Sequence, residues 1–176
     1  LFELLDSNQI HLAAAALPRT VVKNRHLITG PTLFETPVHI VYRTRDKIPR
    51  SIADLSGRKL ALITGSGHTP MLMHEKRKHP GLVWETLENV WPEELLAQLQ
   101  AGEHDAVVIN GMDFDVMRNV YPELAVAFDL PDAQKIVWAL PPRSSLALRN
   151  ALARFIEQVR KDGTLMRVYE RYFGHV

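Results

Sequence analysis

The sequence predicts an α/β fold with a largely parallel sheet. Through the middle of the chain, short apolar segments typical of buried strands alternate with segments of helical periodicity. This alternation is typical of layered α/β domains. Of the 176 residues, 46% are apolar and 23% are charged, so the composition is that of a globular protein with a sizeable core.

A weak internal repeat at an offset of 94 residues suggests two similar α/β lobes. Both copies have the pattern helix, turn, strand. The turn residues are Asn8 and Gly102, the two residue types best suited to a left-handed helix end. A short apolar run typical of a buried strand follows each of them, at 11–14 and 105–108.

The other elements are expected in order along the chain. Residues 37–42 are expected to form a strand, and a polar segment with Pro49 follows. A second strand, 59–64, ends at a Gly-Ser-Gly turn, and Pro70 fits the first turn of the helix that comes next. The remaining expected strands are 82–87, 105–109, 124–128 and 135–140, and the helices are 68–78, 92–101, 113–121 and 146–161.

The closing segment is expected to form an amphipathic helix that docks on a core. Gly163 separates it from the preceding helix, and Gly174 can supply the left-handed residue that ends it. Its apolar residues fall at i, i+3, i+4, i+7 and i+8 and are Leu165, Val168, Tyr169, Tyr172 and Phe173.

These elements suggest that lobe 2, residues 48–137, is inserted between two parts of lobe 1, residues 1–47 and 138–176. The strands near Val41 and Trp138 would cross between the lobes. The chain opens in the middle of an amphipathic pattern with no residue to cap it. We therefore expect lobe 1 to be N-terminally truncated and incomplete.

Several function classes find no support in the sequence. The net charge is +1 and the basic residues are scattered, so nothing indicates nucleic-acid binding. The absence of cysteine excludes disulfides and thiolate chemistry. His68, His74 and His79 are spaced so that they diverge on one helix, and no metal site, cofactor or catalytic constellation is expected. No apolar run is long enough for a transmembrane helix, and we do not expect the opening residues of this sequence to act as an export signal.

The turn from Gly65 to Thr69 is the best candidate ligand site. It lies between a strand and a helix start, where glycines let the backbone approach a ligand and N–H groups attract anions. It is neither a P-loop nor a dinucleotide fingerprint, and a plain structural turn, with Ser66 and Thr69 as caps, is the alternative interpretation.

Three stretches resemble the solute-binding-like domain of the membrane-bound lytic transglycosylase F family, which belongs to the family 3 solute-binding proteins. They are Gly30 to Arg43, Tyr121 to Asp129, and Gly163 to Val176. The resemblance covers nearly the whole chain from about Ala13. It implies a bilobal, periplasmic-binding-protein-like (type II) fold with two crossing strands and a ligand between the lobes.

The resemblance also implies ligand-binding residues. In lobe 1 they are Leu17, Thr20 and Lys23, and in lobe 2 they are Ser66, Gly67, His68 and Asn110. Relatives that bind amino acids carry an arginine where Lys23 stands, and lysine cannot grip a carboxylate as a fork. They carry an acidic residue where Asn110 stands, and an amide brings no charge. Both ends of an amino-acid clamp are therefore weakened.

The function implied is a non-catalytic ligand-sensing module of a periplasmic peptidoglycan lytic transglycosylase, a lyase. It would bind an amino-acid or muropeptide-like ligand and regulate a catalytic domain of the same parent chain, which would be peripheral to the outer membrane. This chain alone is not expected to be an enzyme. A stand-alone amino-acid-binding protein of a periplasmic ABC transporter is the main alternative, and the effector domain of a transcription factor is the third.

Overall fold

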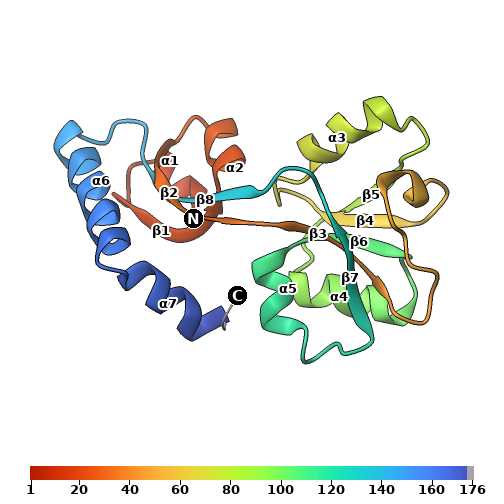
Figure 1. The fold of residues 1–176 in the computed structure, drawn as a ribbon. Helices are drawn as coiled ribbons and strands as arrows, with labels where there is room; N and C mark the ends of the chain where they lie inside the picture. The colour runs from red at the N-terminus through yellow and green to blue at the C-terminus, as the bar shows by residue number, and fades with distance from the viewer. Residues whose placement is uncertain (174–176) are drawn as a thin grey trace. The chain divides into compact units, whose positions relative to one another are not determined.

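The computed structural model describes residues 1–173, which divide into two compact units, each with its own sheet (Figure 1). Unit 1 joins Leu1–Glu35 to the C-terminal segment that starts at Gln134, and unit 2 is Thr36–Ala133. The predicted α/β architecture is confirmed. The lobe boundaries expected from the sequence, at 47/48 and 137/138, stay a prediction.

Unit 2 is built on a five-stranded sheet with the order β5-β4-β6-β3-β7. β4 pairs in parallel with β5 and β6, whereas β3 runs antiparallel to both β6 and β7. Four strands therefore run in one direction and β3 alone opposes them, so two of the four pairings are antiparallel and the sheet is mixed rather than largely parallel. The strands are β3 (Val38–Arg43), β4 (Leu60–Ile63), β5 (Trp84–Leu87), β6 (Ala106–Asn110) and β7 (Leu124–Asp129).

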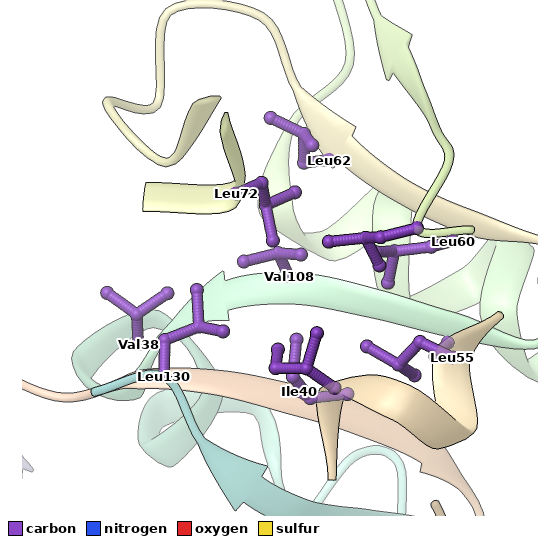
Figure 2. Close-up of a cluster of buried hydrophobic side chains, with 11 residues drawn as sticks. Val38, Ile40, Leu55, Leu60, Leu62, Leu72, Val108 and Leu130 are labelled. Carbon is purple, nitrogen blue, oxygen red and sulfur yellow. The ribbon is translucent and has the colours of Figure 1, made fainter. Parts of the chain in front are cut away.

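Helices cover both faces of this sheet. Successive residues of a strand point to opposite faces, and in β4 and β6 both sets are apolar, so each face packs against helices. Leu60, Leu62 and Val108 pack with Leu72 of α3 in one buried cluster, which Leu55 completes (Figure 2). The intervening residues of β4 and β6 pack in a second cluster with the leucines of α4. The helices of unit 2 are the short 3-10 helix η1 (Ile52–Leu55), α3 (Thr69–Lys78), α4 (Pro92–Ala101) and α5 (Gly111–Met117).

Unit 1 has a three-stranded sheet in which β8 lies between β1 and β2. Val137 and Ala139 of β8 pack in a cluster with Leu5 and Val22, whereas Ile136 and Leu140 pack in another cluster with residues of α6. The alternation along β8 thus supplies two small cores. The elements are α1 (Phe2–Asp6), β1 (Ala13–Pro18), α2 (Arg19–Asn24), β2 (Ile28–Thr36), β8 (Gln134–Leu140), α6 (Leu146–Lys161) and α7 (Thr164–Phe173).

The expectation that the whole apolar stripe of α7 docks on a core is wrong for two of its residues. Tyr169 meets the ring of Phe34 edge to face, with ring centroids 5.3 Å apart, and Leu165 packs on the cluster beneath α6. Val168 and Tyr172, by contrast, are 49% and 69% exposed. Amphipathic spacing identifies an apolar face but not what covers it. The expected helix end at Gly174 lies outside the described residues.

Most other elements fall where the sequence placed them. Asn8 and Gly102 both adopt left-handed backbone conformations, with φ of 59° and 90°, and each lies between a helix and a strand as predicted. α5 differs in its bounds, because it starts at Gly111 rather than Asp113 and ends at Met117 rather than Tyr121. The sequence patterns did not predict α2 or β2, which follow β1 in turn.

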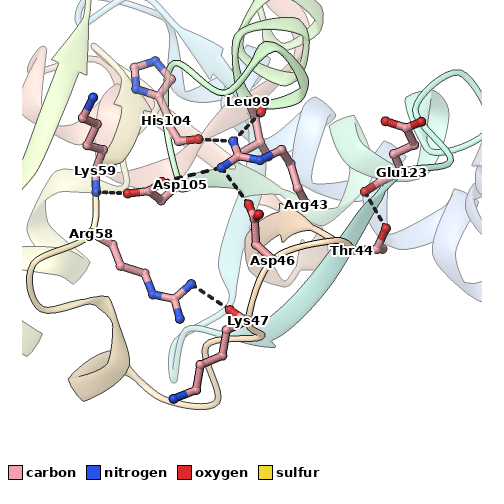
Figure 3. Close-up of polar contacts among 10 residues, drawn as sticks. All are labelled: Arg43, Thr44, Asp46, Lys47, Arg58, Lys59, Leu99, His104, Asp105 and Glu123. Atoms are coloured by element: carbon pink, nitrogen blue, oxygen red, sulfur yellow. Dashed lines mark hydrogen bonds and ion pairs between the residues drawn. The ribbon is translucent and has the colours of Figure 1, made fainter.

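A buried arginine ties three segments of unit 2 together (Figure 3). Arg43, at the end of β3, is 7% exposed. Its Nη1 donates to the carbonyl oxygen of Leu99, at 2.7 Å, and to that of His104. Its Nη2 lies 2.7 Å from a carboxylate oxygen of Asp46 and 3.5 Å from one of Asp105. The guanidinium therefore satisfies carbonyl groups at the end of α4 and before β6, which a buried site cannot leave unpaired without cost.

We predict that Arg43→Met lowers the free energy of unfolding by roughly 3 kcal/mol, because it removes the side-chain donor to the carbonyl groups of Leu99 and His104 and the cation beside the carboxylates of Asp46 and Asp105. Urea unfolding followed by circular dichroism would measure the change. Arg45→Met, at an exposed position two residues on, serves as the control and should change stability by less than about 0.5 kcal/mol. Equal effects of the two substitutions would contradict the assigned role of Arg43.

Candidate functional site

The predicted ligand loop of unit 2 connects β4 to α3. Gly65 and Gly67 have φ of 76° and 82°, in the left-handed region that glycine adopts at little cost. His68 precedes the first residue of α3, and its carbonyl accepts from the backbone N–H of Leu72, at 3.1 Å. The turn is therefore built by its two glycines, as the residue types predicted.

The structure brings two of the predicted site residues together. Nε2 of His68 lies 3.1 Å from Oδ1 of Asn110, which ends β6 and precedes α5. An amide oxygen only accepts, so Nε2 carries the proton in this hydrogen bond. His68 is only 2% exposed, and Asn110 is half-buried. The imidazole thus holds the Asn110 side chain in a fixed orientation.

Asp113 extends this pair and was not among the predicted site residues. Nδ2 of Asn110 donates to Oδ2 of Asp113 at 3.4 Å, so His68, Asn110 and Asp113 form one hydrogen-bonded row. Burial raises the pKa of the Asp113 carboxyl above its usual range, and the hydrogen bond from Asn110 offsets part of that rise. The i, i+3 spacing of Asn110 and Asp113 at a helix start is the sequence signal that could have indicated it.

Gly111 positions the row against β3. Its backbone N–H donates to the carbonyl oxygen of Pro37 at 2.8 Å. A Cβ atom at this position would lie 2.7 Å from Cγ of Pro37 and 2.8 Å from Nε2 of His39. Only glycine allows this close approach, and it fixes the backbone that carries Asn110.

We predict that the raised pKa of Asp113 makes unit 2 less stable at neutral pH. The ionised carboxylate costs free energy in the folded state, and that cost is relieved as the pH falls through the raised pKa toward the unfolded value near 4. Asp113→Asn should therefore stabilise the protein at pH 7 by more than it does at pH 4. Thermal unfolding at a series of pH values would measure this difference.

The control for this prediction is Asp132→Asn, which removes the same charge at an exposed position of the same unit. It should leave the pH dependence of the melting temperature unchanged. A gain from Asp113→Asn that is equal at pH 7 and pH 4 would contradict the role given to burial.

Ser66 lies between the two glycines of the turn in unit 2, and the other three predicted residues lie in unit 1. Leu17 belongs to the end of β1, and Thr20 and Lys23 lie three residues apart on α2. Thr20 and Lys23 are exposed, and Leu17 is half-buried. They form a second group, separate in the chain from the row in unit 2.

Lys23 also lines a pocket that belongs entirely to unit 1. The pocket has a volume of about 460 Å³ and lies between α2, the start of β2 and the first half of α6. Arg19 and Arg149 line it as well, although neither was predicted as a site residue. They are 130 positions apart in the sequence, so no local pattern joins them.

Within residues 1–173, no group of three His, Asp or Glu side chains is placed to hold a metal ion. Among the helices of the same residues, none combines the length and the apolar character needed to cross a membrane.

The fold is that of the type II periplasmic amino-acid-binding proteins. An ancestral arginine-binding protein bound to arginine matches with a TM-score of 0.80 and 22% identity, over 98% of this chain and 76% of that chain. The GluR0 ligand-binding core of Nostoc punctiforme, in complex with L-glutamate, matches with a TM-score of 0.79 and 21% identity, over 98% and 77%. The predicted fold class is confirmed.

The chain belongs to the bacterial extracellular solute-binding proteins, family 3, whose profile matches residues 1–175. It is 72% identical over all 176 residues to a membrane-bound lytic murein transglycosylase F of Thiobacillus denitrificans, of which it spans 37%. It is 36% identical to the protein of the same name in Pasteurella multocida, of which it spans 36%. The resemblance found in the sequence is therefore confirmed, and the chain corresponds to about a third of the length of these relatives.

Proposed function

We propose that this chain is the non-catalytic, ligand-sensing module of a periplasmic peptidoglycan lytic transglycosylase. The observation that carries the proposal is the match of the whole chain, at high identity, to a protein named as such a transglycosylase. The parent would act in the periplasm, peripheral to the outer membrane. The module would bind a cell-wall peptide or an amino-acid-type ligand and regulate a catalytic domain of the same parent chain.

The geometry of unit 2 supports a binding role rather than a catalytic one. The row of His68, Asn110 and Asp113 presents an oriented amide, and a Cβ atom added at Gly65, in the turn before α3, would meet no atom within 4 Å. The ligand-binding residues proposed are those predicted from the sequence: Leu17, Thr20, Lys23, Ser66, Gly67, His68 and Asn110. Asp113 joins them as a residue that positions Asn110.

A stand-alone amino-acid-binding protein of an ABC transporter is the second candidate, because several structures of the same fold carry such names. Their identity to this chain is 16%, so they bear on the fold alone. The far higher identity to transglycosylase F proteins favours the sensing module.

We predict that the purified chain releases no anhydromuropeptides from murein sacculi. The resemblance implies that cleavage depends on a glutamate of a separate catalytic domain, and the sequence of these 176 residues contains no recognisable catalytic motif. Liquid chromatography of the digest, with an active lytic transglycosylase as the positive control, would measure the products. Release of anhydromuropeptides above a blank would overturn the non-catalytic assignment.

We further predict that a cell-wall tetrapeptide binds more tightly than free amino acids. Lys23 and Asn110 weaken the contacts to a single amino acid, and losing a charged hydrogen-bonded partner costs on the order of 2–5 kcal/mol. Such a loss converts micromolar affinity to roughly millimolar. Isothermal titration calorimetry with the tetrapeptide and with the common amino acids would compare the two ligand classes.

Asn110→Ala should weaken tetrapeptide binding by about tenfold, which corresponds to one lost hydrogen bond to a polar ligand. Asn119→Ala, at an exposed position after α5, is the matched control and should leave the affinity unchanged. Micromolar binding of a free amino acid would contradict the proposed ligand class. Equal affinities of the Asn110→Ala and Asn119→Ala variants for the tetrapeptide would contradict the proposed site.

A further inference from the structure

We propose that the pocket of unit 1 is an oxyanion site that takes the carboxylate or phosphate group of a small organic molecule through Arg19, Lys23 and Arg149. The three cations come from two helices, α2 and α6, and line one pocket of about 460 Å³. This proposal goes beyond the sensing function, because six of the seven proposed ligand-binding residues lie outside this pocket.

Arg19 is held in place without being neutralised. Its Nη2 donates to the hydroxyl of Thr32 at 2.8 Å, and Thr32 carries no charge. Its Nε is buried and, among residues 1–173, has no hydrogen-bond partner. A half-buried guanidinium with only a neutral partner keeps its full positive charge beside the pocket.

Arg149 is fixed in the same way from the other side. Its Nε donates to the backbone oxygen of Ser144 at 3.1 Å and lies 3.2 Å from the Ser144 hydroxyl. Its Nη2 donates to the backbone oxygen of Pro142 at 3.2 Å. These contacts order the side chain at the start of α6 but contribute no carboxylate.

The pocket therefore carries three positive charges and no compensating acid. Its lining contains no aspartate or glutamate. Within the part of unit 1 that the structure describes, the ion pairs join Lys135 to Glu35 and Lys161 to Glu157, and neither involves the three cations. Like charges that face one pocket repel one another, and a bound anion removes that repulsion. Arg43 in unit 2, which has two carboxylates beside it, shows the opposite arrangement.

The size and the walls of the pocket indicate an organic anion rather than a bare inorganic ion. Pockets for small molecules occupy roughly 300–1,000 Å³, and this pocket lies in that range. Leu140 and Leu152 supply apolar wall, and Asn150 adds an amide. Such a lining suits a compact molecule with one or more oxyanion groups and a short carbon skeleton.

Titration calorimetry with citrate and with glycerol 3-phosphate, at low ionic strength, tests the proposal and distinguishes the two oxyanion groups. At least one of the two compounds is expected to bind, and its affinity should fall as sodium chloride is added. Lys23→Gln should weaken it by about threefold to tenfold, because Lys23 is exposed and its loss does not disturb packing. Arg19→Gln and Arg149→Gln should weaken it further.

Arg154→Gln is the matched control, because Arg154 is an exposed cation of α6 that does not line the pocket. It should leave the affinity within twofold of the parent value. Absence of binding for both compounds at 10 mM, or an equal loss in Lys23→Gln and Arg154→Gln, would overturn the proposal. Asn110→Ala, in unit 2, should not affect anion binding, so failure here is distinguishable from failure of the tetrapeptide prediction.

Discussion

The buried guanidinium of Arg43 is the constraint on which the geometry of unit 2 depends. It joins the end of β3 to the end of α4 and to the segment that leads into β6. β3 and β6 pair antiparallel from Tyr42 and Ala106 at this end to Val38 and Asn110 at the other. Arg43 therefore secures one end of a strand pair whose opposite end carries the candidate site.

The far end of that strand pair is secured by packing rather than by charge. Gly111 lies against Pro37 so closely that no side chain fits, and the backbone N–H of Met112 donates to the Thr36 hydroxyl at 3.1 Å. Asn110 is thus held by its strand, by the glycine that follows it and by His68. An amide fixed in this way can select ligands by the direction of its hydrogen bonds, which a mobile side chain cannot do.

Local features of the sequence predicted the fold well, because they depend on neighbouring residues. Asn8 and Gly102 could be placed at left-handed helix ends from residue type alone, and both adopt that conformation. The turn at Gly65 and Gly67 was predicted in the same way. The direction of β3 was not, because it depends on pairing with strands more than sixty positions away.

The sequence predicted which residues belong to the candidate site, but it did not predict the contacts between them. His68 and Asn110 were each identified from a resemblance, yet their hydrogen bond spans 42 positions and follows from the strand order β4-β6. Arg19 and Arg149 gave no signal, since their shared pocket exists only once α2 and α6 flank the same strand. The exposure of Val168 and Tyr172 escaped prediction for a similar reason: helical periodicity does not specify a partner.

The central position of β8 in unit 1 bears on the order in which the chain can fold during synthesis. β8 lies between β1 and β2, yet it is made after every residue of unit 2. A ribosome therefore releases the continuous segment of unit 2 complete, while β1 and β2 still lack the strand that joins them. Domains generally fold as units when their sequence has emerged, and unpaired strand edges invite wrong partners. The nascent chain must therefore keep β1 and β2 from mispairing until β8 has been made.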